Sequence, residues 1–355
     1  MQSSAVCSCR LKRAAHRGVE EEATVTRRAT KIAVCVGTRD RPQGVLRLLR
    51  SLESIKVPPD AEIEVIVVEN SQVGSTQQLV EQFARSSRNR MRYFLEQRPG
   101  IASARNRSVH EANDADFYCF VDDDQHVDPE WLVELLKCQK EFDSAGAWGQ
   151  NPPIFARKVP AYVAAFHQPE IYEYGTVVKQ AYTNCLLLQK QWIDRVDGPF
   201  DERLNFMGGE DTLLTSTIAK LGGEIRFTPY AKAYEHVPES RTKPSYLLIR
   251  TFRSANSRYY LQSLRDSDFR KLSIVPGLIL RMCYGLLLSI PFLFVRSNRL
   301  LGFLKISDAL SGFMFLFGFR IKIYAAPAKS SHRNPHSSVL GGVLAGRTTD
   351  GSARV

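Results

Sequence analysis

A short apolar stretch that ends in three acidic residues constrains this chain most. Residues 117–121 are rich in aromatic and β-branched side chains, which is typical of a buried strand, and Asp122, Asp123 and Asp124 follow at once. Open α/β sheets bind ligands at the carboxyl ends of their strands. Extended backbone would direct Asp122 and Asp124 to one side, where carboxylates can hold a divalent cation and a diphosphate. The alternative is a solvated acidic turn or a helix N-cap before Pro129.

The charge of the chain is divided unevenly. The 355 residues carry a net charge of +11, but residues 32–240 hold 23 Lys and Arg against 30 Asp and Glu. The basic excess therefore lies in the two flanking segments. This distribution argues against a nucleic-acid partner and favours a mildly acidic domain of ample size held against an anionic membrane surface.

The cysteines and the chain ends indicate a reducing compartment. The seven cysteines lack the spacing of a metal site or a disulfide framework, and Cys35, Cys119 and Cys185 fall within predicted strands, where a thiol acts as a small hydrophobe. The basic residues 1–30 contain no apolar segment of the kind found in secretory signals. We expect disordered tails at residues 1–30 and 325–355.

Strand and helix patterns alternate before the acidic cluster. This alternation predicts a mostly parallel sheet covered by helices. Polar residues follow the predicted strands at the edge that carries the acids, and Gly100 would let the backbone approach a ligand there. The predicted strands are residues 32–36, 63–68 and 92–95, and the predicted helices are residues 45–52, 76–85 and 102–110. The polar residues after these strands are Thr38, Arg39, Glu69, Asn70, Arg105 and Asn106.

The second half of the predicted domain has weaker patterns. Residues 148–182 are aromatic without a clean period, and we expect an irregular segment there, between a helix at Trp131 and strands at residues 185–188 and 225–228. Glu210 and Asp211 begin a helix, whose dipole keeps carboxylates ionised and favours a base over an acid. Helix capping accounts for one of these acids but not for the two glycines before them.

Taken together, these motifs resemble glycosyltransferase family 2, the inverting nucleotide-sugar enzymes with the GT-A fold. The resemblance covers residues 32–236 and implies an α/β, Rossmann-like domain over residues 31–240, with a mostly parallel central sheet and flanking helices. The motifs that carry it are Thr38-Arg39, Glu69-Asn70, Gly100, Ala104-Arg105-Asn106, Asp122-Asp123-Asp124 as a DxD motif, Gly198-Pro199-Phe200-Asp201-Glu202 and Gly208-Gly209-Glu210-Asp211.

The resemblance also implies a role for each matching residue. Asp211, beside Glu210, would be the catalytic base. Asp122 would contact the ribose or sugar, and Asp124 would bind Mg²⁺ or Mn²⁺ on the diphosphate. If these acids bind a metal, His236 is the best candidate for a further ligand, although a single His after a strand is commonly structural. The remaining donor-site residues would be Thr38, Arg39 and Glu69 at the nucleoside, with the Glu69 carboxylate on the base, together with Asn70, Gly100, Arg105 and Asp123.

Residues 241–324 differ from the rest in being both basic and apolar. Their two uncharged stretches, residues 282–295 and 309–319, are shorter than the about 20 residues that a spanning helix needs. A double crossing would place the basic loop between them outside, against the positive-inside tendency. We therefore expect interfacial or re-entrant helices on the cytoplasmic face of the inner membrane. The alternative is a buried helical pair that completes the catalytic domain.

The preferred function is a membrane-associated, metal-dependent glycosyltransferase, of the hexosyltransferase kind. It would move a sugar from a nucleotide-sugar, with UDP-sugar as first choice, to a saccharide or lipid-linked saccharide of an exopolysaccharide or cell-surface glycan. One alternative is a sugar nucleotidyltransferase, although the glycine-rich loop with a following Lys is missing after the first strand. Another is a non-catalytic membrane-bound nucleotide-binding scaffold. A dehydrogenase is disfavoured because no GxGxxG follows the first strand.

Overall fold

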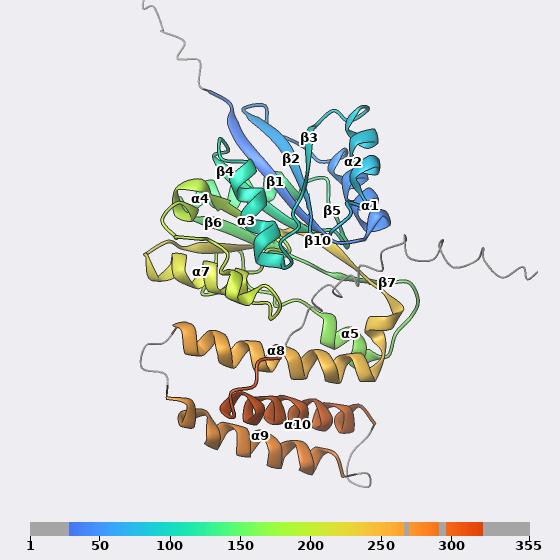
Figure 1. The fold of residues 1–355 in the computed structure, drawn as a ribbon, viewed down its shortest axis with the longest axis vertical. Helices are drawn as coiled ribbons and strands as arrows, with labels where there is room; N and C mark the ends of the chain where they lie inside the picture. The colour runs from blue at the N-terminus through green and yellow to red at the C-terminus, as the bar shows by residue number, and fades with distance from the viewer. Residues whose placement is uncertain (1–27, 266–269, 291–295, 322–355) are drawn as a thin grey trace, which may run out of the picture.

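The structure is a computed structural model that describes residues 28–265, 270–290 and 296–321. The predicted tail at residues 325–355 lies outside the described residues, as do residues 1–27 of the other tail and residues 291–295 of the first apolar stretch. The described chain has a central sheet between helices, followed by a separate layer of three C-terminal helices (Figure 1).

A ten-stranded sheet runs through the first part of the chain, in the order β3-β2-β1-β4-β9-β6-β10-β5, with β7 and β8 paired to β10. Strands β1 to β4 pair in parallel, while β9 is antiparallel to β4 and β6. The predicted mostly parallel sheet is thereby confirmed. The strands are β1 Thr30–Thr38, β2 Ala61–Glu69, β3 Arg90–Leu95, β4 Phe117–Asp122, β5 Gln125–Val127, β6 Gly146–Gln150, β7 Pro153–Phe155, β8 Val177–Val178, β9 Leu186–Gln189 and β10 Ile225–Val237.

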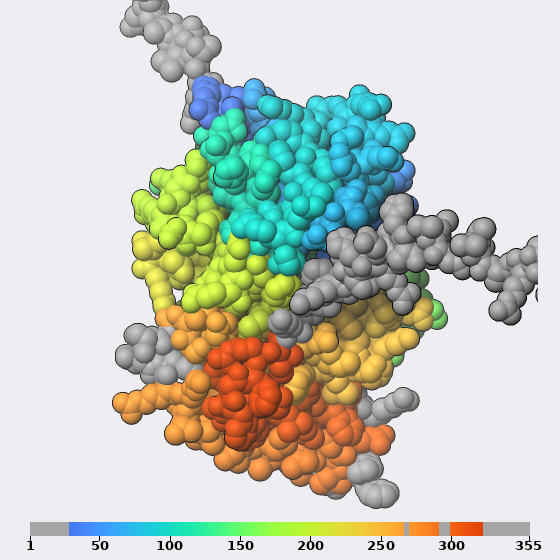
Figure 2. All heavy atoms as spheres, in the orientation of Figure 1, coloured from blue at the N-terminus to red at the C-terminus, as the bar shows by residue number. Residues whose placement is uncertain are grey.

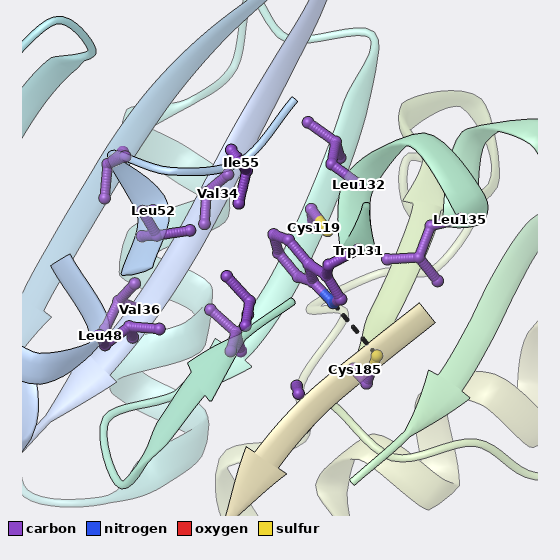
Figure 3. Packing of buried hydrophobic residues seen from close by; sticks show 14 of the residues in the cluster. Val34, Val36, Leu48, Leu52, Ile55, Cys119, Trp131, Leu132, Leu135 and Cys185 are labelled. Atoms are coloured by element: carbon purple, nitrogen blue, oxygen red, sulfur yellow. Dashed lines mark hydrogen bonds between the residues drawn. The ribbon is translucent and has the colours of Figure 1, made fainter. Parts of the chain in front are cut away.

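Helices cover both faces of this sheet, as expected for parallel strands with continuous apolar sequences. Alternate residues of β1 divide between two cores: Val34 packs with α1 and α4, whereas Cys35 packs with α3 and α7. In the first core the indole nitrogen of Trp131 lies 3.2 Å from Cys185 Sγ (Figure 3). These helices are α1 Pro42–Leu52, α2 Gln77–Ala84, α3 Ile101–Glu111, α4 Trp131–Glu141, α5 Ala161–His167, α6 Lys190–Ile193 and α7 Glu210–Lys220.

The prediction of an irregular segment at residues 148–182 is correct for more than half of these residues, but it missed several short elements. This segment contains most of β6, all of β7 and β8, and α5. The sequence Gly-Ala-Trp-Gly-Gln of β6 lacks β-branched residues, so its extended form depends on its pairing with β9 and β10. Strand β10 also continues well past residue 228, because a register shift between Phe227 and Lys232 accommodates Pro229.

The C-terminal region is helical, as predicted, and α8 Pro244–Arg265 lies between the sheet domain and the two last helices (Figure 1). Its Ser257 hydroxyl donates to the Met207 carbonyl at 2.6 Å, and Leu261 packs in a small core with Leu204 and Met207. Helices α9 Val275–Leu288 and α10 Arg296–Leu316 pack on each other, and α10 also packs on α8. The short 3-10 helices are η1 Glu202–Leu204, η2 Glu239–Thr242 and η3 Lys271–Ile274.

The outer helices leave many apolar side chains exposed. Within the described residues, one helical segment, Lys271–Leu288, is long and apolar enough to cross a membrane, with a mean hydropathy of 1.5, and only 17% of it is buried. The second predicted stretch lies mostly in α10. Figure 2 shows the residues of α9 and α10 as a continuous surface at the end of the molecule opposite α1 and α2. The low burial disagrees with the alternative of a buried helical pair.

Candidate active site

A cleft of about 620 Å³ opens at the carboxyl ends of β1 and β4, where the sequence predicted a site. The starts of α3 and α7 and the beginning of the C-terminal region complete its walls. All the predicted site residues except Glu69 and His236 line this cleft. The lining residues among them are Thr38, Arg39, Asn70, Gly100, Arg105, Asp122, Asp123, Asp124, Glu210 and Asp211.

The three consecutive acids after β4 have different environments. Asp123 is only 5% exposed, and its carboxylate accepts hydrogen bonds from Thr38 Oγ1 at 2.7 Å and Arg41 Nη1 at 2.9 Å. The side chains of Asp122 and Asp124 are more open, at 42% and 22% exposure. Asp123 therefore anchors the turn to β1 and α1, while the two acids beside it remain accessible to a ligand.

A glycine of α1 allows this turn to pack closely. A Cβ atom at Gly44 would lie 2.5 Å from the carbonyl oxygen of Asp123, which is too close for any other residue without movement of the backbone. On the other side of the turn, the amide of Asp122 donates to Gln125 Oε1 at 2.9 Å. The position of the acids is thus fixed by contacts to elements on both sides.

Arg105 joins Asp122 to Glu210 beneath the cleft. Its Nη2 atom lies 3.3 Å from Asp122 Oδ1, and its Nη1 atom pairs with Glu210 Oε1. Burial raises the pKa of Glu210 to about 7, against the opposing effect of Arg105. Asp122 is open to the cleft but otherwise enclosed by protein, and this partial loss of hydration, with the charges of Asp124 and other nearby acids, raises its pKa to about 7 despite Arg105. Arg105 therefore positions and partly neutralises two carboxylates of the site.

Two glycines in left-handed conformations place the acids at the start of α7. Gly208 has φ 76° and Gly209 has φ 92°, a region that other residues enter at a cost of about 1 kcal/mol or more. A Cβ atom at Gly209 would also lie 2.3 Å from Leu261 Cδ1 of α8. The paired glycines, which capping did not explain, are required by this turn and by the close approach of α8.

Asp211 faces the cleft from the first turn of α7. Its Oδ1 atom accepts from the Thr212 amide at 2.6 Å, and its Oδ2 atom lies 3.4 Å from the amide and 3.5 Å from the hydroxyl of Thr183. An oriented carboxylate of this kind can accept a proton from a hydroxyl group bound in the cleft.

Glu69 does not reach the cleft. It is fully buried at the end of β2, and its carboxylate accepts hydrogen bonds from the amides and hydroxyls of Ser75 and Thr76 and from the Tyr93 hydroxyl, at 2.6–3.0 Å. Burial opposes its ionisation, but the bonds from Thr76, Ser75 and Tyr93 prevail and lower its pKa. With five donors around it, Glu69 holds the loop after β2 in place, and its predicted contact with a base stays a prediction.

Asn70 lines the cleft and also stabilises the fold through hydrogen bonds to the backbone. Its side chain donates to the carbonyls of Glu96 and Arg98 at 3.0 and 2.7 Å and accepts from the Gly100 amide at 2.7 Å. Gly100 has φ 138°, and a Cβ atom there would lie about 2.1 Å from the Asn205 side chain. These two residues therefore connect β2, α3 and η1 at one wall of the cleft.

His236 points away from the cleft. Its Nε2 atom lies 2.8 Å from His126 Nδ1, and burial, together with the charges of Arg47 and His126, lowers its pKa to about 4. Successive side chains of a strand point to opposite faces, so it is Glu235, the preceding residue of β10, that lines the cleft. In this structure His236 therefore bonds to His126 and not to the acids, and its role as a metal ligand stays a prediction.

Sequence reasoning missed several residues of the cleft. Arg241 and Arg250 were assigned to the membrane region, but both line the cleft, and Arg241 Nη1 lies 3.1 Å from Asp124 Oδ2. Glu235 and Arg41 were not predicted as site residues either, although Arg41 Nη1 lies 3.4 Å from Asp124. The period of two along β10 could have selected Glu235. The arginines depend on long-range packing, which has no local signal.

The acids fit a divalent ion that is shared with a substrate. The described residues contain no group of three or more His, Cys, Asp or Glu side chains suited to hold a metal ion. Asp122 and Asp124 nevertheless offer hard carboxylate oxygens at an open cleft. Mg²⁺ is typically bound by one or two carboxylates together with substrate phosphates. The residues present therefore suit Mg²⁺ or Mn²⁺ bound together with a diphosphate.

Comparisons with known proteins agree with this geometry. The sequence profile described as glycosyl transferase family 2 matches residues 33–189. Succinoglycan biosynthesis protein ExoM of Rhizobium meliloti (strain 1021) is 31% identical over 243 residues, which are 68% of this chain and 77% of that protein. Putative glycosyltransferase EpsH of Bacillus subtilis (strain 168) is 26% identical over 86 residues, 24% of each chain.

A solved structure supports the fold independently. The mannosyltransferase PcManGT from Pyrobaculum calidifontis, in complex with GDP-Man and Mn²⁺, has a TM-score of 0.57 and 14% sequence identity, and the match covers 82% of this chain and 88% of that one. At this identity the likeness concerns the fold alone. With the family profile and the similarity to ExoM, it leads to one conclusion: the chain belongs to glycosyl transferase family 2 and has the GT-A fold.

Proposed function

We propose that this protein transfers a sugar, with inversion, from a nucleotide-sugar to a saccharide or lipid-linked saccharide during exopolysaccharide synthesis. A UDP-sugar is the first donor to test. One observation carries the proposal: Asp122, Asp124 and Asp211 line the same cleft, so a donor-binding acid pair and a base can face one substrate. The similarity to a succinoglycan biosynthesis protein supports the exopolysaccharide setting.

In this proposal, Asp122 and Asp124 hold the donor through Mg²⁺ or Mn²⁺. The ion, when bound, stabilises the negative charge that develops on the leaving diphosphate. Arg39 and Arg41, which also line the cleft, add positive charge near the same place. The mannosyltransferase PcManGT, a neighbour in fold, has been solved in complex with GDP-Man and Mn²⁺, which agrees with a metal-dependent donor site.

Asp211 acts as the base. It accepts the proton of the acceptor hydroxyl while the acceptor oxygen bonds to the anomeric carbon and the bond from that carbon to the diphosphate oxygen breaks. Attack from the face opposite the leaving group inverts the anomeric configuration. Thr183 keeps the Asp211 carboxylate oriented through its amide and hydroxyl.

An aromatic wall beside the base suits a sugar acceptor. Trp148 and Tyr182 line the cleft, and their ring centroids lie 5.5 Å apart in an edge-to-face arrangement. Phe166 and His167 of α5 line it as well. Aromatic side chains combine an apolar face with a polar rim, which matches the alternating apolar and hydroxyl surfaces of a pyranose ring.

The three C-terminal helices would hold the enzyme on the cytoplasmic face of the inner membrane. Leu272, Leu280 and Phe317 are 77%, 71% and 79% exposed, and the exposed Arg270 and Lys271 directly precede Leu272 in the chain. Apolar side chains beside basic ones are typical of helices that lie in the interface of anionic membranes. This placement would keep a lipid-linked acceptor near the cleft, because α8 carries Arg250, which lines the cleft.

A donor screen with analysis of the product tests the proposal. The full-length protein is incubated with UDP-, GDP- and dTDP-sugars, a saccharide acceptor and Mn²⁺, and the anomeric configuration of the product is read by NMR. We expect release of a nucleoside diphosphate and an inverted linkage. Release of pyrophosphate would instead indicate a sugar nucleotidyltransferase, and metal-dependent nucleotide binding without turnover of any donor would indicate a non-catalytic scaffold.

A further inference from the structure

Arg241 pairs with carboxylates from two elements of the chain, the turn after β4 and strand β10. Its Nη1 atom lies 3.1 Å from Asp124 Oδ2 and 3.0 Å from Glu235 Oε1. All three side chains line the cleft and are only 16–22% exposed. The carboxylate proposed to bind the metal is therefore already engaged by a cation of the chain itself.

Arg241 differs in this from Arg41, the other arginine at Asp124. Arg41 is 48% exposed, lies closer to Asp123, at 2.9 Å, and approaches Asp124 only to 3.4 Å. It can therefore keep its principal partner when a ligand binds Asp124. Arg241 uses a single nitrogen for both of its carboxylates, so an ion on Asp124 would meet the guanidinium directly.

A divalent ion and Arg241 compete for the same carboxylate oxygen. Two cations within a few ångströms repel each other, and partial burial weakens the screening by water. A bound nucleoside diphosphate offsets this repulsion between the ion and Arg241, because it brings negative charge beside the ion. A guanidinium is well suited to phosphate oxygens, which it can contact through two parallel hydrogen bonds.

We propose that Arg241 is a counter-cation that exchanges partners: it neutralises Asp124 before the donor arrives and binds the diphosphate once the ion occupies Asp124. Glu235 retains the guanidinium during the exchange, so Arg241 remains at the cleft in both states. This inference rests on the proposed function, since it requires a metal and a diphosphate at this site. It also assigns a donor-binding role to the segment that leads into α8.

The exchange predicts effects of opposite sign on two ligands. Removing the charge of Arg241 should strengthen the binding of the ion alone, because a competitor is lost. The same change should weaken the binding of a nucleoside diphosphate in the presence of the ion, because a phosphate partner is lost. A purely structural role for Arg241 would weaken both or change neither.

The test compares Arg241→Gln with the wild-type full-length protein. Mn²⁺ binding without nucleotide is measured from the electron paramagnetic resonance signal of the free ion, and UDP binding at saturating Mn²⁺ is measured by calorimetry. We expect Mn²⁺ to bind about threefold to tenfold more tightly to the variant, as for loss of a partly exposed ion pair. We expect UDP to bind about tenfold to a hundredfold more weakly, as for loss of a charged hydrogen bond.

Two further variants serve as references. Arg241→Lys keeps the positive charge without the two-pronged geometry, so its affinity for Mn²⁺ should stay within about twofold of wild type while UDP binding falls part of the way. Arg157→Gln removes an exposed arginine that pairs with Glu239 of η2, and it should leave both affinities unchanged. Thermal unfolding confirms that each variant is folded.

The possible outcomes distinguish a failure of this inference from a failure of the proposed function. Equal or weaker Mn²⁺ binding by Arg241→Gln overturns the exchange, whatever happens to UDP. Tighter Mn²⁺ binding with undiminished UDP binding also overturns it, because no phosphate contact is then made. If the wild-type protein shows no Mn²⁺-dependent binding of UDP, GDP or dTDP, the proposed function fails first, and this inference fails with it.

Discussion

The two ends of the cleft are built in different ways. At the donor end, Asp122 and Asp124 follow β4 and are fixed by buried contacts within the sheet domain, such as those of Asp123 to Thr38 and Arg41. At the catalytic end, Asp211 follows a glycine turn that α8 holds in place from outside the sheet domain. We infer that donor binding depends on the sheet domain and on Arg241, which precedes α8, whereas proton transfer depends on the contact of α8 with the glycine turn.

Gly209→Ala should damage the catalytic end alone. The new Cβ would meet Leu261 and would occupy a left-handed conformation, so α8 and the start of α7 must separate. We expect kcat to fall about tenfold or more, since small displacements of catalytic groups are costly, while Mn²⁺-dependent UDP binding stays within about twofold. Steady-state kinetics and calorimetry measure the two effects.

Gly222→Ala is the matched control for this prediction. Gly222 follows the same helix with φ 89°, but no atom lies within 4 Å of the position that a Cβ atom would take there. The Gly222→Ala substitution therefore introduces the backbone strain without a contact to α8, and turnover should not change. Equal losses of kcat in the two variants would show that strain, rather than the support from α8, explains the effect.

Negative charges introduced on the outer helices should weaken membrane binding without weakening donor binding. The double variant Leu280→Glu, Phe317→Glu replaces two strongly exposed apolar residues of the C-terminal region. We expect binding to vesicles that contain anionic lipid to fall at least about tenfold, because two apolar side chains no longer insert. UDP binding should be preserved, since both residues lie outside the lining of the cleft.

Val73→Glu provides the comparison for membrane binding. Val73 is 81% exposed in the loop after β2, far along the chain from the outer helices. Its substitution adds one negative charge without touching the C-terminal surface, so vesicle binding should change little. Co-sedimentation of the double variant at the wild-type level would remove the membrane role of this surface.

Glu69→Gln should change stability more than ligand binding. Loss of the buried carboxylate weakens the hydrogen bonds of Ser75, Thr76 and Tyr93, at a cost of about 1–2 kcal/mol. Because folding lowers the pKa of Glu69, its contribution is present above the unfolded pKa of about 4.3 and is lost as the pH falls through the folded pKa. The difference in melting temperature from wild type should therefore be a few degrees at pH 7 and narrow below about pH 4.

Glu62→Gln, an exposed position on the same strand, should leave the melting temperature unchanged. UDP binding by Glu69→Gln is the measurement that decides whether Glu69 only stabilises the loop or also contacts the base. If Glu69→Gln keeps the wild-type melting temperature but loses UDP binding, the carboxylate contacts the base after all.

Local sequence patterns predicted the buried parallel strands and the acidic residues at the edge of the sheet. The continuous apolar runs of β1, β2 and β4 identified the parallel sheet, and the acids after β4 and before α7 identified the two ends of the cleft. Strand β6 was missed because its short Gly-Ala-Trp-Gly-Gln sequence is extended only through its neighbours.

Roles that depend on side-chain direction or on distant contacts were harder to predict. His236 was chosen for its chemistry, yet the alternation of β10 places Glu235 in the cleft instead. Glu69 was chosen for its position after a strand, but donors from the following loop and from β3 occupy its carboxylate. Arg241 pairs with Asp124, 117 residues earlier in the chain, and no local pattern indicates such a contact.

The most direct test of the account measures UDP binding and sugar transfer side by side in Asp124→Asn and Asp211→Asn. We predict that Asp124→Asn loses Mn²⁺-dependent UDP binding, whereas Asp211→Asn keeps it and loses transfer by about a hundredfold to ten-thousandfold, the usual contribution of a general base. Undiminished transfer by Asp211→Asn, or equal loss of UDP binding in both variants, would contradict the assignment of binding and proton transfer to separate carboxylates of one cleft.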